Sequence, residues 1–158
     1  MYCVSAVARL LTTGAFLALA HVAGGQTLVV RPLQNLTFGF LLPGVPTTID
    51  AAQIILSGQI QVEAAIGTSF EIRYTLPAAM SGAGTTLPLT FATNAAGAAP
   101  SANPAAMLRF NPANPARFQL VTTTRATFFL GGRASPRVGQ PVGAYTAPIV
   151  VTITNLGI

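Results

Sequence analysis

Few residues of this 158-residue chain carry the side chains that catalysis and metal binding need. Its histidine is His21, its cysteine is Cys3, and its carboxylates are Asp50, Glu63 and Glu71. A Ser-His-Asp or Cys-His arrangement would depend on His21, and zinc would lack its usual nitrogen and sulfur ligands. Calcium prefers clustered oxygen ligands, whereas Asp50 is isolated in the sequence. We therefore predict no metal site and no cofactor.

The carboxylates Glu63 and Glu71 leave one kind of catalysis to consider, acid–base hydrolysis of a glycosidic bond. Each lies at an outward position of a segment with alternating residues, where no burial raises the pKa of the carboxylate. If the segment that carries Glu63 and the segment that carries Glu71 form a hairpin about Gly67, the two carboxylates face each other and Arg73 lies diagonally beside Glu63. Such a surface charge cluster is not a cleft, so we predict no catalytic residues and no enzymatic activity.

Residues 1–25 have the parts of a secretory signal peptide, a positive charge followed by an apolar run from Leu10 to Ala20 and then small residues. Cleavage is predicted after Ala20 or after Gly25. A membrane anchor is the alternative, but the run is shorter than the roughly 20 apolar residues that span a bilayer. We predict an exported protein with no stable membrane span after cleavage. Cys3 leaves with the signal, so no disulfide is available.

The charge of the chain is low and basic. Charged residues make up 7% of the chain and the formal net charge is +5, with arginine supplying every positive side chain. The arginines beyond residue 26 stand singly, without the basic run or recognition helix of a nucleic-acid-binding protein. We predict no nucleic-acid binding. Scattered basicity favours solubility or a weak attraction to an anionic envelope.

From Thr27 onward, short segments with alternating apolar and polar residues recur between turn signals, as is typical of an all-β sandwich. In the C-terminal run, Ile149, Val151 and Ile153 share one face of an extended chain. The predicted strands are Thr27–Arg31, Leu36–Phe40, Thr47–Ala51, Gln59–Ala64, Ser69–Leu76, Thr86–Phe91, Arg117–Val121, Ala126–Leu130 and Ile149–Thr154.

Residues 92–116 are predicted to form a long irregular loop. They are rich in Ala, Asn and Pro, and their Asn-Pro pairs disfavour a helix. A loop of this length inside a domain is either functional or mobile. It is interpreted either as a crossover between the sheets or as a binding or assembly loop.

Several segments together resemble the bacterial secreted domain of unknown function 4402 family. The matching segments are Leu36-Thr37-Phe38-Gly39, Leu42 to Thr48, Tyr74 to Pro77, Thr86 to Phe91, Phe129-Leu130-Gly131-Gly132, and Gly143-Ala144-Tyr145-Thr146 through Thr154. The closing Gly-x-Tyr strand is also similar to that of spore coat protein U and related fimbrial subunits. The resemblance implies an exported β-sandwich without an assigned activity or site residues. The fimbrial relatives usually carry a disulfide, which the chain from Gln26 onward lacks.

Fimbrial subunits polymerise by β-strand addition, in which an N-terminal extension of one subunit completes the sandwich of the next. Here Thr27–Arg31 is either the donated strand or part of a self-complete sandwich, and the self-complete form is preferred because the terminal strand is full length. Tyr145 also has two interpretations, an interface or ligand aromatic, or a core residue whose hydroxyl bonds to the backbone at a strand corner.

The prediction is a single all-β domain over residues 26–158, an immunoglobulin-like, pilin-like antiparallel β-sandwich of about seven to nine strands, preceded by a cleavable signal helix. The predicted core is Phe38, Phe40, Ile60, Val62, Phe70, Ile72, Tyr74, Leu76, Leu89, Phe91, Phe128, Leu130, Tyr145, Ile149, Val151 and Ile153.

The predicted role is a structural or surface-assembly protein of the bacterial cell envelope, located in the periplasm, at the outer surface or outside the cell. Self-association would use the strand edges at Thr27–Arg31 and Ile149–Thr154. The alternative is a monomeric extracellular module that binds a polymer such as glycan.

Overall fold

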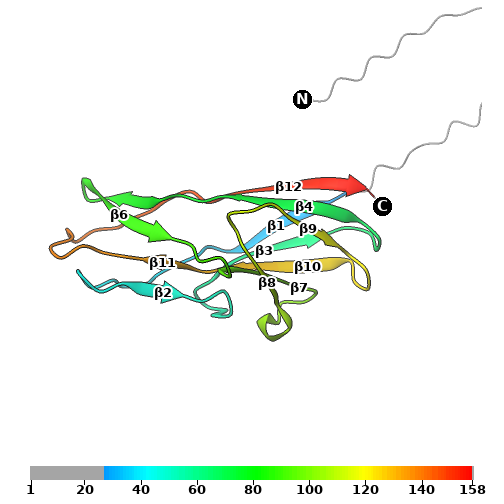
Figure 1. The fold of residues 1–158 in the computed structure, drawn as a ribbon, viewed down its shortest axis with the longest axis horizontal. Coiled ribbons are helices and arrows are strands. Elements are labelled where there is room, and N and C mark those ends of the chain that lie inside the picture. Colours follow the sequence, from blue (N-terminus) through cyan, green and yellow to red (C-terminus); the bar gives the residue numbers. More distant parts are fainter. Residues whose placement is uncertain (1–26, 158) are drawn as a thin grey trace, which may run out of the picture.

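The computed structural model describes residues 27–157 of the chain (Figure 1). The predicted signal segment, with Cys3 and His21, lies outside the described residues, as does Ile158. The described part contains twelve strands and one short 3-10 helix, η1 (Pro104–Ala106), and every strand pairing is antiparallel. The predicted all-β, sandwich-like fold is confirmed at this level. Within residues 27–157, no helix has the length and apolarity needed to cross a bilayer.

The largest sheet has five strands in the order β1, β3, β10, β7, β8. Their bounds are β1 (Val29–Gln34), β3 (Gly58–Glu63), β10 (Arg125–Leu130), β7 (Ala96–Ala99) and β8 (Leu108–Phe110). The central pair runs without a register shift, with Glu63 opposite Arg125 and Gly58 opposite Leu130. β1 forms one edge of this sheet, and its register with β3 shifts between Pro32 and Gln34, where the strand ends.

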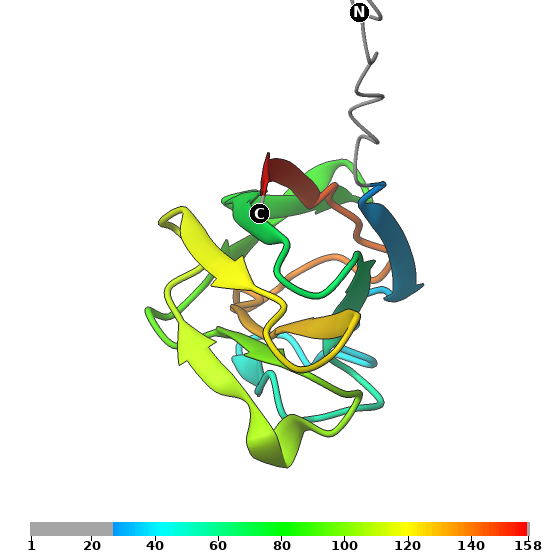
Figure 2. The ribbon, with the colours of Figure 1, turned by 90° about the vertical axis from the view of Figure 1, so that its right-hand side faces the viewer.

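Two smaller sheets complete the fold. The four-stranded sheet has the order β2 (Thr47–Ile49), β11 (Gly132–Ala134), β6 (Thr85–Thr90), β5 (Ala79–Gly82). The three-stranded sheet has the order β12 (Val150–Gly157), β4 (Ser69–Thr75), β9 (Ala116–Gln119). The three-stranded sheet lies over the five-stranded sheet, and the four-stranded sheet forms the other end of the molecule (Figures 1 and 2).

Two long segments each contribute a strand to two sheets. β4 is followed after Pro77 by β5, and β10 is followed after Gly131 by β11. Proline has no N–H to continue a ladder. Gly131 has no side chain, and a Cβ there would contact the carbonyl oxygen of Ile49 and lie 2.8 Å from the amide nitrogen of Ala51. These breaks, together with β7 and β8, produce more strands than the predicted seven to nine.

The main core lies between the five-stranded and three-stranded sheets. The Phe128 ring centroid is 5.0 Å from that of Phe118 and 5.8 Å from that of Phe70, both in edge-to-face geometry. Predicted core residues that are buried are Val62, Phe70, Ile72, Tyr74, Leu89, Phe128 and Leu130. Those that are half-buried are Phe38, Ile60, Leu76, Phe91, Tyr145, Ile149, Val151 and Ile153.

The prediction that Phe40 belongs to the core is wrong, because its relative exposure is 105%. The predicted strand Leu36–Phe40 does not form. Alternation assigns a side chain to a face only while the chain stays extended, and Gly39 has a positive φ of 64° that turns the backbone just before Phe40.

The prediction of an irregular segment over residues 92–116 is also wrong in part, because β7 and β8 lie within it. All four residues of β7 are buried, and β7 pairs with β10. A Cβ at Gly97 would contact the Sδ of Met107. The small side chains that resemble low complexity in the sequence therefore allow Met107 to pack directly on the strand, against Phe129 and its neighbours.

Candidate functional site, an apolar groove between two strand edges

A groove of about 760 Å³ opens between the edge strands β1 and β12. Val30 and Pro32 of β1 line one side, and Val151 of β12 lines the other. The core residues Tyr74 and Phe128 also line it. Each of the two strands is last in its sheet order, and they lie at neighbouring margins of the two layers (Figure 2, blue and red). The groove therefore exposes part of the core between two edges that have no further partner strand among the described residues.

The pairing of β12 and the proline in β1 account for this open side. β12 pairs with β4 along its whole length, from Val150 opposite Thr75 to Gly157 opposite Ser69, so the terminal strand extends the three-stranded sheet and does not bridge to β1. Proline is typical of edge strands because it cannot donate a ladder hydrogen bond, and Pro32 lies inside β1. The two edges predicted at Thr27–Arg31 and Ile149–Thr154 both border this groove.

Two tyrosines line the groove. Burial raises the pKa of the Tyr74 phenol. The Tyr145 hydroxyl donates a hydrogen bond to the carbonyl oxygen of Pro141 at 2.8 Å and accepts one from Nε2 of Gln140 at 2.9 Å. The backbone hydrogen bond of the core interpretation is present, while the half-buried ring also borders the groove.

The predicted hairpin about Gly67 does not form. β3 pairs with β1 and β10, whereas β4 pairs with β12 and β9, so Glu63 and Glu71 lie on different sheets. Both strands have an apolar face, and these faces pack against each other across the core. Glu63 instead contacts Arg125 at 3.0 Å and Arg31 at 3.5 Å, each on a neighbouring strand.

Glu71 is also held by two arginines. Nη2 of Arg73 lies 3.2 Å from one carboxylate oxygen, and Nε of Arg117 lies 3.2 Å from the other. These hydrogen bonds, that from Arg73 first, lower the pKa of Glu71. A general acid in glycoside hydrolysis needs a raised pKa, so this environment favours a fixed anion. The structure does not bring the two candidate carboxylates together.

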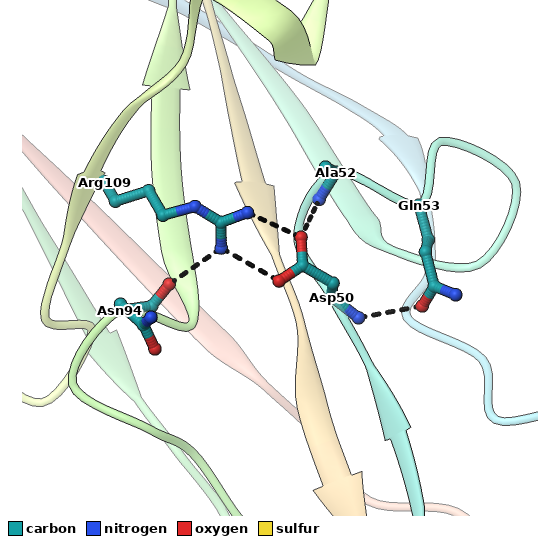
Figure 3. Close-up of polar contacts among 5 residues, drawn as sticks. All are labelled: Asp50, Ala52, Gln53, Asn94 and Arg109. Carbon is teal, nitrogen blue, oxygen red and sulfur yellow. Dashed lines mark hydrogen bonds and ion pairs between the residues drawn. The ribbon is translucent and has the colours of Figure 1, made fainter.

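Asp50 forms a bidentate ion pair with Arg109 (Figure 3). Its carboxylate accepts hydrogen bonds from Nη2 and Nη1 of Arg109 at 2.6 Å and 3.0 Å, and from the backbone N–H of Ala52 at 2.8 Å. Nη1 also donates to the carbonyl oxygen of Asn94 at 3.2 Å, and the Asp50 N–H donates to Oε1 of Gln53 at 2.8 Å. The hydrogen bonds from Arg109 are the main cause of the lowered pKa of Asp50. This ion pair connects the turn after β2 to β8.

In the part of the chain that the structure describes, no group of three or more His, Cys, Asp or Glu side chains is placed to hold a metal ion. The chain matches no family model, no curated protein and no solved structure. The groove between β1 and β12 is the candidate site, and its chemistry is that of an apolar surface with open backbone edges on both sides. The two strand edges are predicted from the sequence but the groove is not, and the proline in β1 is a sequence signal that could have marked the β1 edge.

Proposed function

We propose that this chain is an exported structural or surface-assembly protein of the bacterial cell envelope, without catalytic activity. In this proposal it has the immunoglobulin-like, pilin-like sandwich of the domain of unknown function 4402 family and of fimbrial subunits, which its sequence resembles. The observation that supports the proposal is the apolar groove bordered by the edges of β1 and β12.

An extended segment of another chain is the ligand that such a groove suits. In β-strand addition, backbone N–H and C=O groups of an open edge bind the incoming strand, and alternate side chains enter apolar pockets. The half-buried core residues Ile60 and Val151 line this groove and are available to such side chains.

The strands at the groove have little of the usual protection against pairing, and β12 has none of it. Natural proteins protect exposed edges with charged side chains, most often lysine, or with proline. β1 carries Arg31 and Pro32, but its groove residue Val30 is 43% exposed. β12 has no charged residue, and Val150 is 52% exposed. An uncharged edge at β12 and an edge with exposed apolar residues at β1, on one side of the molecule, favour association with a second copy.

The test is the absolute mass of the purified full chain by light scattering over a hundredfold concentration range, with electron microscopy of the same samples. We expect oligomers or fibres that grow with concentration. The double variant Val30→Lys with Pro32→Lys places two charges on the groove side of β1 and should remain monomeric. Both residues are exposed, so little core packing is lost.

The matched control is Val29→Lys with Leu33→Lys, which adds the same charge to exposed positions of the same strand that do not line the groove. It should assemble like the unaltered chain. A monomer at every concentration, or equal loss of assembly in both double variants, would rule out assembly through the groove.

The alternative, a monomeric module for an extracellular polymer such as glycan, is favoured by the half-buried Tyr145 ring at the groove. If the chain is monomeric and is retained on a glycan matrix, and if Tyr145→Ala abolishes this retention, the alternative replaces the assembly proposal.

A further inference from the structure

Large apolar side chains protrude into solvent from two loops at the end of the molecule formed by the four-stranded sheet. We call these residues the apolar tip. The tip consists of Phe40, Leu42, Val45, Val138 and Val142, with relative exposures of 105%, 68%, 51%, 93% and 98%. Single exposed apolar residues are ordinary, but a group of them on one surface marks an interaction site.

The residues of the tip belong to one surface. Phe40 and Val142 line the same cavity, of about 550 Å³. The backbone N–H of Gly44 donates a hydrogen bond to the carbonyl oxygen of Arg137 at 3.1 Å. A Cβ on Gly44 would lie 3.0 Å from Cγ2 of Val138. The loops 39–46 and 136–143 are therefore in direct contact.

These loops are held in place from inside. Gly44 and Gly139 have positive φ values of 77° and 76° and turn the backbone without strain. The side chain of Gln140 is mostly buried; it accepts a hydrogen bond from the N–H of Arg137 at 3.3 Å and donates one to the hydroxyl of Tyr145 at 2.9 Å. The apolar side chains point outward from an ordered support.

Most arginines of the described residues have a carboxylate partner. The carboxylates of Asp50, Glu63 and Glu71 hold five arginines in ion pairs, namely Arg31, Arg73, Arg109, Arg117 and Arg125. Among residues 27–157, Arg133 and Arg137 are the two arginines for which the structure has no carboxylate partner. Arg137 is in the tip loops, Arg133 precedes them on β11, and the loops 39–46 and 136–143 contain no carboxylate. Arg137 therefore places a positive charge without a carboxylate partner beside the apolar tip.

We propose that the apolar tip inserts into the headgroup region of an anionic lipid bilayer and attaches the protein to that membrane surface. Apolar side chains that enter the boundary between headgroups and acyl chains, with basic residues behind them, are the physical requirements of interfacial binding. An arginine near an anionic surface adds about 1 kcal/mol of attraction. None of the five tip residues lines the groove between β1 and β12, so this inference does not depend on the proposed assembly.

The absence of tryptophan from the chain permits a site-specific probe. Phe40→Trp places the sole indole at the tip, and Val121→Trp places it at a position 66% exposed in the loop between β9 and β10, at the other end. Both variants are made in the full chain and mixed with vesicles of phosphatidylglycerol and phosphatidylethanolamine. We expect a blue shift and quenching by brominated lipid for Phe40→Trp and neither for Val121→Trp.

Affinity for the same vesicles is measured by sedimentation. Phe40→Ser and Val142→Ser should each weaken binding roughly tenfold, because each removes a large apolar side chain from the membrane. Val121→Ser is the matched control and should bind like the unaltered chain. Arg137→Gln should weaken binding about fivefold on anionic vesicles and should not change it on phosphatidylcholine.

An unchanged emission spectrum of Phe40→Trp with vesicles would overturn the proposal, even if the chain sediments with them through another segment. Equal weakening in Phe40→Ser and Val121→Ser would overturn it as well. Concentration-dependent association that is lost in Phe40→Ser, without vesicle binding, would instead assign the tip to a second copy. The Val30→Lys, Pro32→Lys variant should bind vesicles normally, which separates this test from that of groove-mediated assembly.

Discussion

At the scale of single residues, the described carboxylates are all engaged by arginines. An ion pair between exposed side chains contributes roughly 0–1 kcal/mol, because water and salt screen it. The pair between Asp50 and Arg109 is bidentate, with side chains 51% and 35% exposed, so its contribution belongs at the upper part of that range. Its role is to fix the position of β8 relative to the turn after β2.

Arg109→Gln should lower the free energy of unfolding at pH 7 by about 0.5–1 kcal/mol. The pKa of Asp50 is lower in the folded chain than its ordinary value of 3.8, chiefly through Arg109. This stabilisation is therefore complete above pH 3.8 and is lost as the pH falls through the lowered pKa. Urea unfolding at pH 7 and at acidic pH measures it, and the difference from the unaltered chain should shrink in acid.

Arg133→Gln is the control for that measurement, because it removes an exposed arginine that has no ion pair among the described residues. It should change stability little at either pH. A loss in Arg109→Gln that is equally large in acid would show that packing of the arginine, and not the ion pair, stabilises β8.

At the scale of elements, the fold depends on chain segments that leave one sheet and enter another. The passage from β10 to β11 brings Gly131 against the backbone of the turn that follows β2. Backbone atoms of that turn cannot move aside as the end of a long side chain can. The connection between the five-stranded and four-stranded sheets therefore requires glycine at this position.

Gly131→Ala should destabilise the chain by about 1–3 kcal/mol or more, the usual range for overpacking a tight site. Thermal unfolding measures the effect. Gly84→Asn is the comparison, because Gly84 has a φ of 71° and open space around it, and asparagine tolerates that conformation. It should remain within about 0.5 kcal/mol of the unaltered chain. A neutral Gly131→Ala would mean that the turn after β2 is farther from β10 than described.

At the scale of the whole molecule, one aromatic cluster joins the two main layers. Phe128 of the five-stranded sheet contacts Phe70 and Phe118 of the three-stranded sheet. The same layers separate where the groove opens between β1 and β12, and Phe128 also lines that groove. The aromatic cluster therefore holds the two layers together beneath the groove.

Phe128→Ala should lower the free energy of unfolding by about 3–5 kcal/mol, because it leaves a cavity at the centre of the cluster. Phe40→Ala, an identical change at a fully exposed position, should stay within about 0.5 kcal/mol. Urea unfolding of both variants tests the pair. A large effect at Phe40 would mean that this ring is buried, contrary to the described position of the tip.

The sequence by itself determined the strand character of the chain and the faces of its regular strands. Alternation placed Phe70 and Ile72 inward and Glu71 outward, because a side chain in an extended segment is assigned to a side by its position alone. The sequence also showed that the chain has few side chains that could act in catalysis or bind a metal.

Only the tertiary structure decided which strands pair and what they leave exposed. Alternation does not distinguish a hairpin from two strands packed across a core, so the separation of Glu63 from Glu71 was not predictable. The sequence did not predict β7, because its residues are small and its burial depends on Met107 and β10 packing against it. The groove, the apolar tip and the ion pair between Asp50 and Arg109 all arise from contacts between distant segments, whose free energies depend on the assembled chain and not on any local pattern.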